Sequence, residues 1–209
     1  MLALFRFIGA NPAKNFTLDP RSLAGYNRQM AKNIFFISDT HFGHEAPYNK
    51  FLKNDKVTLL RPHGSAEAGD TAMVENWNRV VKPDDRVYHL GDVTMSHKAS
   101  ALEIFRKLNG KKVLIKGNHD VAKLSAYAEH FNDVRSIHHF DGVVITHVPL
   151  HPGSLSRWGT NVHGHTHANS VTDIQGNKDP RYLCVSVEQI NYTPISLEQV
   201  KKLIKEQQC

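Results

Sequence analysis

The 209-residue sequence has few of the features that mark a disulfide-stabilised or membrane-spanning protein. It contains only two cysteines, Cys184 inside an apolar segment and Cys209 at the last position. A structural disulfide is therefore not expected, and the composition fits a reducing, cytoplasmic compartment. No apolar run approaches the roughly 18 residues that a membrane-spanning helix needs. With 40% hydrophobic and 22% charged residues, the composition is that of a globular domain with a substantial core.

Acidic residues are also comparatively scarce, 20 against 26 basic residues, so the formal net charge is +6. Most of this excess lies in residues 1–32, which contain five basic residues and a single acidic one. The remaining chain carries only +2, which does not establish specific binding of nucleic acid. We expect residues 1–32 to form a basic extension that either packs on the outside or is dispensable. Residues 33–209 are expected to form the functional domain.

Five short polar signatures each follow an apolar run. They are Asp39-Thr40-His41, Gly91-Asp92, Gly117-Asn118-His119-Asp120, Thr146-His147 and Gly164-His165-Thr166-His167. The preceding runs, such as Ile34–Ile37, are rich in β-branched and aromatic residues, which predicts that most of them are buried strands. Open α/β sheets bind ligands beyond the carboxyl ends of their strands. The pattern therefore predicts that five strand ends converge on one site.

The side chains at these strand ends favour a metal site. Histidine combined with aspartate suits Zn, Mn, Fe or Ni, whereas Ca and Mg prefer oxygen ligands alone. The seven candidate ligands are Asp39, His41, Asp92, Asn118, His147, His165 and His167. These are too many for one tetrahedral ion, so we expect two ions that share a carboxylate, roughly 3.5–4 Å apart. The positive charge of two divalent ions would exceed the negative charge of the two aspartates, and the excess would attract a phosphate group.

In this order the signatures resemble the calcineurin-like metallophosphoesterase family, over residues 34–188. The resemblance implies an α/β fold of two facing mixed β-sheets flanked by helices. It also implies a phosphoesterase with two divalent ions, for which we expect Mn²⁺, with Fe, Ni or Zn as alternatives. In the implied ligand sets, Asp39, His41, Asp92 and His167 hold one ion, and Asp92, Asn118, His147 and His165 hold the other. Spacing alone does not distinguish His163 from His165 and His167, since alternate residues of an extended chain share a face.

Phosphoester hydrolysis also requires assistance at the leaving oxygen. A water shared by two ions has a pKa lowered toward about 7 and can attack phosphorus in line. The leaving oxygen then needs a proton, which a histidine held by a carboxylate is suited to supply. We therefore predict His119 as the catalytic acid and Asp120 as its orienting partner. This assistance favours phosphodiesters over phosphomonoesters.

Substrate choice must come from loops, because the metal centre recognises only the phosphoryl group. His44 directly follows the first signature and is predicted to face the substrate. Arg157 could bind a second phosphate and Trp158 could stack on a base, which would favour a nucleotide or nucleic-acid substrate. The alternative is that Trp158 packs beneath its loop while Arg157 is solvated. No membrane partner is expected.

Three other functions remain open at this stage. A phosphomonoesterase or nucleotide phosphatase would use the same centre. A non-catalytic scaffold of this fold would show gaps among the ligands, and the sequence has none. A basic nucleic-acid-binding module would retain binding after its metal was chelated.

Periodicity also predicts several structural elements. Helices are expected over residues 71–81 and 97–108, and a final helix is expected after the capping box Ser196-Leu197-Glu198-Gln199. His89 lies inside an apolar run and is predicted to be a core histidine.

Overall fold

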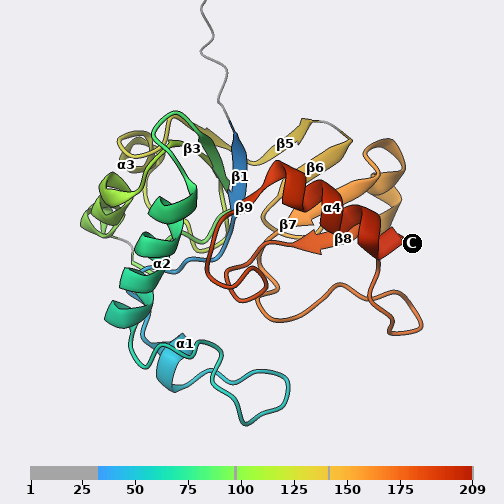
Figure 1. Ribbon diagram of the computed structural model, residues 1–209, viewed down its shortest axis with the longest axis horizontal. Helices are drawn as coiled ribbons and strands as arrows, with labels where there is room; N and C mark the ends of the chain where they lie inside the picture. The colour runs from blue at the N-terminus through green and yellow to red at the C-terminus, as the bar shows by residue number, and fades with distance from the viewer. Residues whose placement is uncertain (1–32, 97, 141, 209) are drawn as a thin grey trace, which may run out of the picture. The chain divides into compact units, whose positions relative to one another are not determined.

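The computed structural model describes residues 33–96, 98–140 and 142–208 (Figure 1). The predicted extension over residues 1–32 lies outside these described residues. Among the residues described, no helix is both long and apolar enough to cross a membrane.

Two mixed β-sheets form the centre of the domain. The first has the order β4 (Asp133–Arg135), β3 (Lys111–Ile115), β2 (Arg86–His89), β1 (Ile34–Ile37) and β9 (Ile195–Ser196). The second has the order β5 (Ile137–Phe140), β6 (Val143–Thr146), β7 (Thr160–His163) and β8 (Tyr182–Cys184). Strands β1 to β4 are parallel and β9 is antiparallel to β1. In the second sheet, only β5 is antiparallel to its neighbour.

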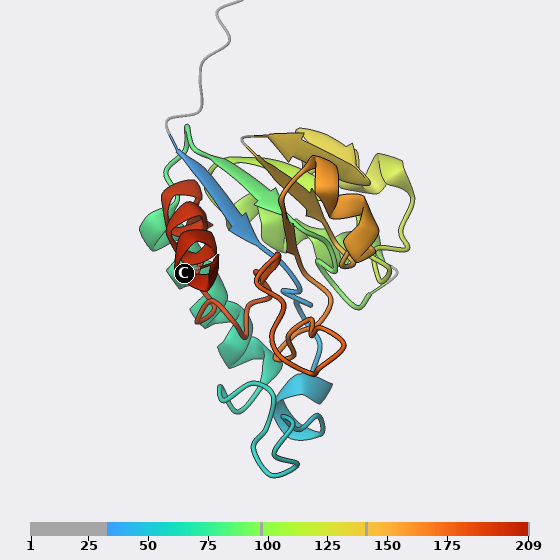
Figure 2. The same cartoon turned by 90° about the vertical axis from the view of Figure 1, so that its right-hand side faces the viewer.

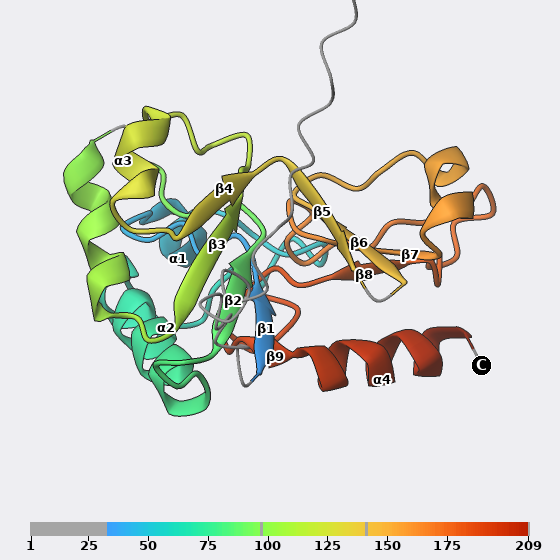
Figure 3. The same ribbon diagram turned by 90° about the horizontal axis from the view of Figure 1, so that it is seen from above.

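Helices lie on the outside of this pair of sheets. Figure 3 shows α2 (Ala66–Val80) and α3 (Leu124–Ala128) beside the first sheet, on the side away from the second. The last helix, α4 (Leu197–Gln208), packs against β1, β8 and β9, and Figure 2 shows it beside β1. Two mixed sheets flanked by helices are the architecture that the family resemblance implies, and this expectation is confirmed.

The alternation of side chains along β6 divides the apolar residues of the second sheet between two faces. Val143 and Ile145 belong to the large core cluster that also contains Phe36 and Val87 of the first sheet. Val144, between them in sequence, belongs to a smaller cluster with Leu155 and Tyr182. The main core therefore packs the two sheets together and fixes the positions of their strand ends relative to one another.

The predicted helices are present with changed boundaries. Helix α2 begins earlier than predicted, because the Ser65 side chain accepts a hydrogen bond from the Ala68 N–H at 3.2 Å and caps the first turn. The segment predicted as a helix over residues 97–108 contains a 3₁₀ helix, η1 (Ala99–Lys107). Its buried residues Leu102 and Phe105, and Leu108 directly after its end, recur every three positions, which suits the three-residue turn of that helix.

Two short helices remain, α1 (Ala46–Asn49) and the 3₁₀ helix η2 (Pro152–Arg157). The predicted capping box of α4 is confirmed: the Gln199 N–H donates to Ser196 Oγ at 3.2 Å, and the Ser196 N–H donates to Gln199 Oε1 at 2.7 Å.

Trp77 provides a test of how the outer helices are held. Its side chain is fully buried and its indole N–H donates to the Asn109 carbonyl at 2.9 Å. We expect Trp77→Ala to lower the free energy of unfolding in urea by about 3–5 kcal/mol, because it leaves a cavity beneath α2. Trp77→Phe keeps most of the ring and should cost clearly less. Equal losses in the two variants would contradict this packing role.

Candidate metal centre

The candidate ligands lie just beyond the carboxyl ends of five strands. The first sheet contributes residues after β1, β2 and β3, and the second sheet contributes residues after β6 and β7. In chain order the positions are Asp39 and His41, then Asp92, then Asn118, then His147, then His165 and His167. The structure brings six of them together as two separate groups of potential metal ligands.

The first group consists of Asp39, His41 and His167. Asp39 Oδ1 lies 3.9 Å from His41 Nε2 and 3.9 Å from His167 Nε2. Two ligands on a tetrahedral ion with bonds of about 2.1 Å stand about 3.4 Å apart, so these atoms are close to the spacing that one ion requires. Asp39 Oδ1 is buried without a hydrogen-bond partner. An unpaired buried carboxylate oxygen is costly, and a divalent cation would satisfy it.

The other oxygen of Asp39 is held by the protein. Asp39 Oδ2 accepts hydrogen bonds from Ser38 Oγ at 2.5 Å, from Ser186 Oγ at 2.7 Å and from the His165 N–H at 2.9 Å. These three bonds orient the carboxylate so that Oδ1 faces the two histidines. The sequence prediction missed both serines.

The second group consists of Asp92, His147 and His165. Asp92 Oδ2 lies 3.4 Å from His147 Nε2. Asn118 joins this group, because its Oδ1 lies 2.9 Å from both His147 Nε2 and His165 Nδ1. These donors are carboxylate, amide oxygen and imidazole, which fit a borderline divalent ion.

Asp92 stands between the two groups. Its Oδ2 is 3.7 Å from His41 Nε2 in the first group and 3.4 Å from His147 Nε2 in the second. Its Oδ1 accepts the His119 backbone N–H at 2.9 Å, which fixes the orientation of the carboxylate. A carboxylate placed in this way has the geometry to bridge two ions.

The backbone at the candidate ligands is unusual. The φ angles are 57° at Asp39, 44° at His41, 58° at Asp92, 69° at His165 and 50° at His167. Residues other than glycine rarely adopt positive φ, and such conformations persist where the surrounding structure enforces them. Their concentration here indicates that the fold holds these side chains in position at some cost in backbone energy.

Two glycines of the signatures allow the loops to approach the carboxylates. A Cβ atom on Gly117 would collide with the Asp92 carboxylate, and one on Gly164 would collide with the Ser38 hydroxyl and the Asp39 carboxylate. Any larger residue at either position would displace a candidate ligand.

Metal binding needs neutral histidine and ionised carboxylate, and the pKa shifts of the candidate ligands differ in direction. Burial would lower the pKa values of His147 and His167, but their bonds to Asp92 and Glu188 outweigh it and raise both. Burial lowers the pKa of His41 to about 2, so its ring is neutral. Burial would raise the pKa of Asp92, but the hydrogen bond and charge of His147 outweigh it and leave the pKa at about 2. Burial raises the pKa of Asp39, whose free oxygen lacks a compensating partner.

Arg61 and Glu188 support the first group, and the sequence prediction missed both. The fully buried Arg61 donates to the carbonyl oxygens of Thr40 at 2.7 Å and of Asp39 at 2.6 Å. It also donates to Glu188 Oε1 at 2.8 Å, and Glu188 Oε2 lies 3.2 Å from His167 Nδ1. Glu188 directly follows the apolar segment ending at Val187, which is the same signal that marks the other signatures. Arg61 lies in an irregular segment and has no comparable signal.

His119 and Asp120 occupy different environments. The His119 side chain is exposed, and its ring lies 5.5 Å from that of His41, at the edge of the first group. The buried Asp120 carboxylate accepts the N–H groups of Asp92, Val93 and Gly117 at 2.7–2.9 Å. No hydrogen bond joins it to the His119 ring in the described part of the chain. Asp120 therefore orders the loops that carry the candidate ligands, and its predicted role in orienting His119 stays a prediction.

The predicted substrate residues are separated in the structure. The His44 ring lies 5.9 Å from the His41 ring, beside the first group. Trp158 packs against the smaller cluster of the second sheet with Leu155, and Arg157 is exposed at the end of η2. Neither Arg157 nor Trp158 belongs to the two ligand groups, so their role in substrate binding stays a prediction.

Two other histidines are buried, and each lies within hydrogen-bond distance of a protein oxygen. His89 is fully buried and its Nε2 lies 3.0 Å from Thr40 Oγ1, as the prediction of a core histidine expects. His163 is buried, and its Nδ1 lies 2.7 Å from the Gly164 carbonyl oxygen, outside both ligand groups.

Comparisons with known proteins identify related chains. The uncharacterised protein MJ1445 of Methanocaldococcus jannaschii is 36% identical over 179 residues, which cover 83% of this chain and 92% of MJ1445. A crystal structure of AQ665, a protein of unknown function from Aquifex aeolicus, matches with a TM-score of 0.60 and 28% identity. That match covers 82% of this chain and 98% of AQ665.

A solved archaeal phosphodiesterase aligns more weakly, with a TM-score of 0.42 and 19% identity over 74% of this chain and 82% of the other. This likeness is too low to carry an argument about activity. No family model matches the sequence.

The contact between Glu188 and His167 can be tested through metal affinity. We expect Glu188→Gln to weaken metal binding by about 10–100-fold, because carboxylates behind ligating histidines orient the ring and raise its basicity. Competition with a chromogenic chelator measures this affinity without any assay of activity. Glu198→Gln, at an exposed position on α4, is the matched control. Unchanged affinity in Glu188→Gln would contradict the role of Glu188.

Proposed function

We propose that this chain, which belongs to the same family as the uncharacterised protein MJ1445, is a phosphoesterase of the calcineurin-like type with two divalent metal ions. Phosphodiesters are its favoured substrates. The observation that carries the proposal is the position of Asp92 Oδ2, within 3.7 Å of His41 Nε2 and 3.4 Å of His147 Nε2, which belong to different ligand groups.

The donor sets support this reading. Asp39, His41 and His167 would hold one ion, and Asn118, His147 and His165 the other, with Asp92 shared. When bound, two divalent ions would lower the pKa of a shared water and neutralise the charge on the phosphoryl oxygens. Mn²⁺ is the ion we expect, with Fe, Ni or Zn as alternatives, because imidazole and carboxylate ligands accommodate all of them.

The protein's own groups would position the reaction. The bonds from Ser38, Ser186 and the His165 N–H keep Asp39 in one orientation. The bond from the His119 N–H does the same for Asp92. Carboxylates held in this way would not need to reorient as the charge on the phosphoryl group changes, and such preorganisation would favour the transition state.

His119 is proposed as the group that assists departure of the ester oxygen. As water attacks phosphorus, the bond between phosphorus and the ester oxygen breaks, and that oxygen needs a proton. The exposed His119 ring, 5.5 Å from that of His41, is near enough to the first ligand group to donate one. His44, on another side of His41, is proposed to contact the substrate.

A hydrolysis panel tests the function. The purified protein is depleted of metal, loaded separately with Mn²⁺, Ni²⁺, Fe²⁺ or Zn²⁺, and assayed on mono- and bis-aryl phosphates, cyclic nucleotides, dinucleoside polyphosphates and single-stranded DNA and RNA. We expect metal-dependent turnover that is fastest on diesters. Faster turnover of monoesters would favour the alternative of a phosphomonoesterase. Nucleic-acid binding that survives EDTA, without any hydrolysis, would instead support a binding module.

The bridging role of Asp92 gives a second prediction. Asp92→Asn should lower bound metal, measured by mass spectrometry, and should lower kcat/KM by more than about 100-fold, since a shared ligand affects both ions. Asp84→Asn changes an exposed turn residue and serves as the matched control. A variant at position 92 with wild-type metal content and turnover would rule out the bridge.

The role of His119 gives a third prediction. His119→Ala should slow hydrolysis of unactivated alkyl diesters by about 100-fold or more, the range of general-acid assistance, and should affect bis-p-nitrophenyl phosphate far less. The reason is that p-nitrophenolate leaves without needing a proton. His139→Ala, at an exposed position on β5, is the control. Equal losses on both substrates would argue against proton donation to the leaving group.

A further inference from the structure

A cavity of about 400 Å³ opens directly beside the candidate metal centre. Its lining includes His165 and His167, which belong to different ligand groups, together with Phe51, Leu52, Lys53 and Asn54. A phosphoryl group bound by both ligand groups would therefore carry one of its ester substituents toward this cavity. The volume lies within the range of about 300–1,000 Å³ that is typical of small-molecule sites.

The far wall of this cavity comes from a structured loop over residues 50–60. Leu52 and Leu59 form an antiparallel bridge, and the Leu60 N–H donates to the Phe51 carbonyl at 2.8 Å. At the tip of the loop, the Asp55 carboxylate accepts from the N–H groups of Val57 and Thr58, both at 2.9 Å. These bonds hold Phe51 at the edge of the cavity.

Several large hydrophobic side chains are exposed in the described part of the chain, and among these Phe51 alone is aromatic. Its side chain has 44% of its surface accessible. The Phe51 and His44 rings form an edge-to-face pair with their centroids 5.7 Å apart. His44 in turn lies 5.9 Å from the His41 ring. Phe51 is thus separated from the first ligand group by a single ring, and it lines the cavity.

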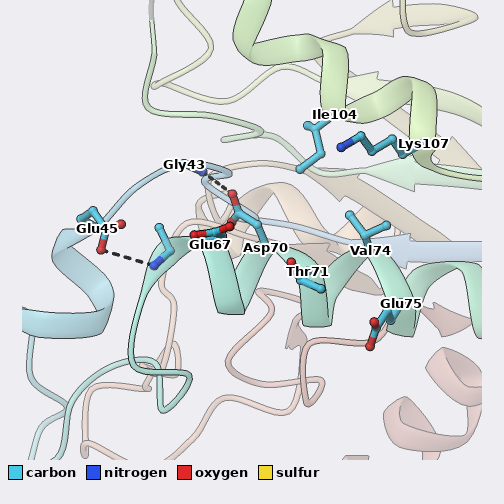
Figure 4. Close-up of a pocket in the computed structure, with 10 residues that line it drawn as sticks. Gly43, Glu45, Glu67, Asp70, Thr71, Val74, Glu75, Ile104 and Lys107 are labelled. Carbon is cyan, nitrogen blue, oxygen red and sulfur yellow. Dashed lines mark hydrogen bonds between the residues drawn. The ribbon is translucent and has the colours of Figure 1, made fainter.

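The charges around the cavity favour a nucleotide. Lys53 lines it, and no carboxylate is among its described lining residues, while Asn54 and Asn169 supply amides that both donate and accept hydrogen bonds. A larger cavity of about 670 Å³ lies between α2 and η1, and its lining includes Glu45, Glu67, Asp70 and Glu75 together with Lys107 of η1 (Figure 4). Those carboxylates would repel a polyanion, so the larger cavity does not suit the same ligand.

We propose that the cavity beside His165 and His167 binds the base of a nucleotide phosphodiester, with Phe51 stacking on the base. This inference rests on the proposed function and specifies its substrate class. Aromatic side chains stack on every base, because each base has a π-face. Asn54 and Asn169 would contact the edge of the base, and Lys53 would attract the phosphate backbone.

The test compares two esters with the same leaving group. Thymidine 5′-(p-nitrophenyl phosphate) carries a base, whereas methyl p-nitrophenyl phosphate does not, so the ratio of their kcat/KM values measures recognition of the base. Four metal-loaded proteins are assayed: the wild type, Phe51→Ala, Phe51→Tyr and Val57→Ala. Val57 is 81% exposed in the same loop and does not line the cavity, so it controls for disturbance of the loop.

We expect the wild type to prefer the thymidine ester by tenfold or more. Phe51→Ala should lose about tenfold on the thymidine ester, mainly through KM, while its rate on the methyl ester stays unchanged. Phe51→Tyr and Val57→Ala should retain the wild-type preference.

Other outcomes would overturn the inference. Equal wild-type rates on the two esters, or an unchanged preference in Phe51→Ala, would rule out base recognition by Phe51 and leave the phosphoesterase function standing. Equal losses on both esters in Phe51→Ala would show a structural role instead. No hydrolysis of either ester by the metal-loaded wild type would overturn the proposed function itself.

Discussion

The buried carboxylates of Asp39 and Asp92 impose the constraint on which the rest of the site depends. Each is almost fully removed from solvent, and one oxygen of Asp39 has no hydrogen-bond partner. A buried negative charge is stable only when partners or a cation compensate it. The histidines around the two aspartates place their ring nitrogens 3.4–3.9 Å from the carboxylate oxygens, at distances that suit shared coordination of an ion.

Several other features follow from this constraint. The carboxylates reach their positions only because the chain adopts positive φ at Asp39 and Asp92 and because Gly117 and Gly164 carry no Cβ. The backbone of these strained turns is stabilised by hydrogen bonds with two buried side chains. Arg61 binds the carbonyl oxygens at Asp39 and Thr40, and the Asp120 carboxylate binds three backbone N–H groups of the neighbouring loops. The strain is thus offset by hydrogen bonds that do not themselves involve a candidate ligand side chain.

Predictions from sequence succeeded where the signal is local. The run Ile34–Ile37 is β1 over the same residues, and the capping box at Ser196 forms as expected, because strand burial and helix capping involve residues close in sequence. Strands β4 and β9 were missed, since three and two residues carry no recognisable pattern and depend on pairing with β3 and β1. The sequence left the position of Trp158 open between two alternatives. Its packing against the smaller cluster is a tertiary contact, which no local pattern indicates.

The sequence by itself determined the α/β class and placed the candidate ligands at strand ends, because each ligand closely follows an apolar strand and the ends of parallel strands meet at one edge of a sheet. The choice of His165 and His167 over His163, and the expectation of two facing sheets, rested on the family resemblance. Only the tertiary structure decided which groups support those ligands. Ser186 binds Asp39 across 147 positions, and Arg61 binds Glu188 across 127. Such contacts have no local periodicity and exist only once the two sheets pack together. The same holds for Phe51, whose place beside His165 and His167 depends on how a loop folds against a distant strand end.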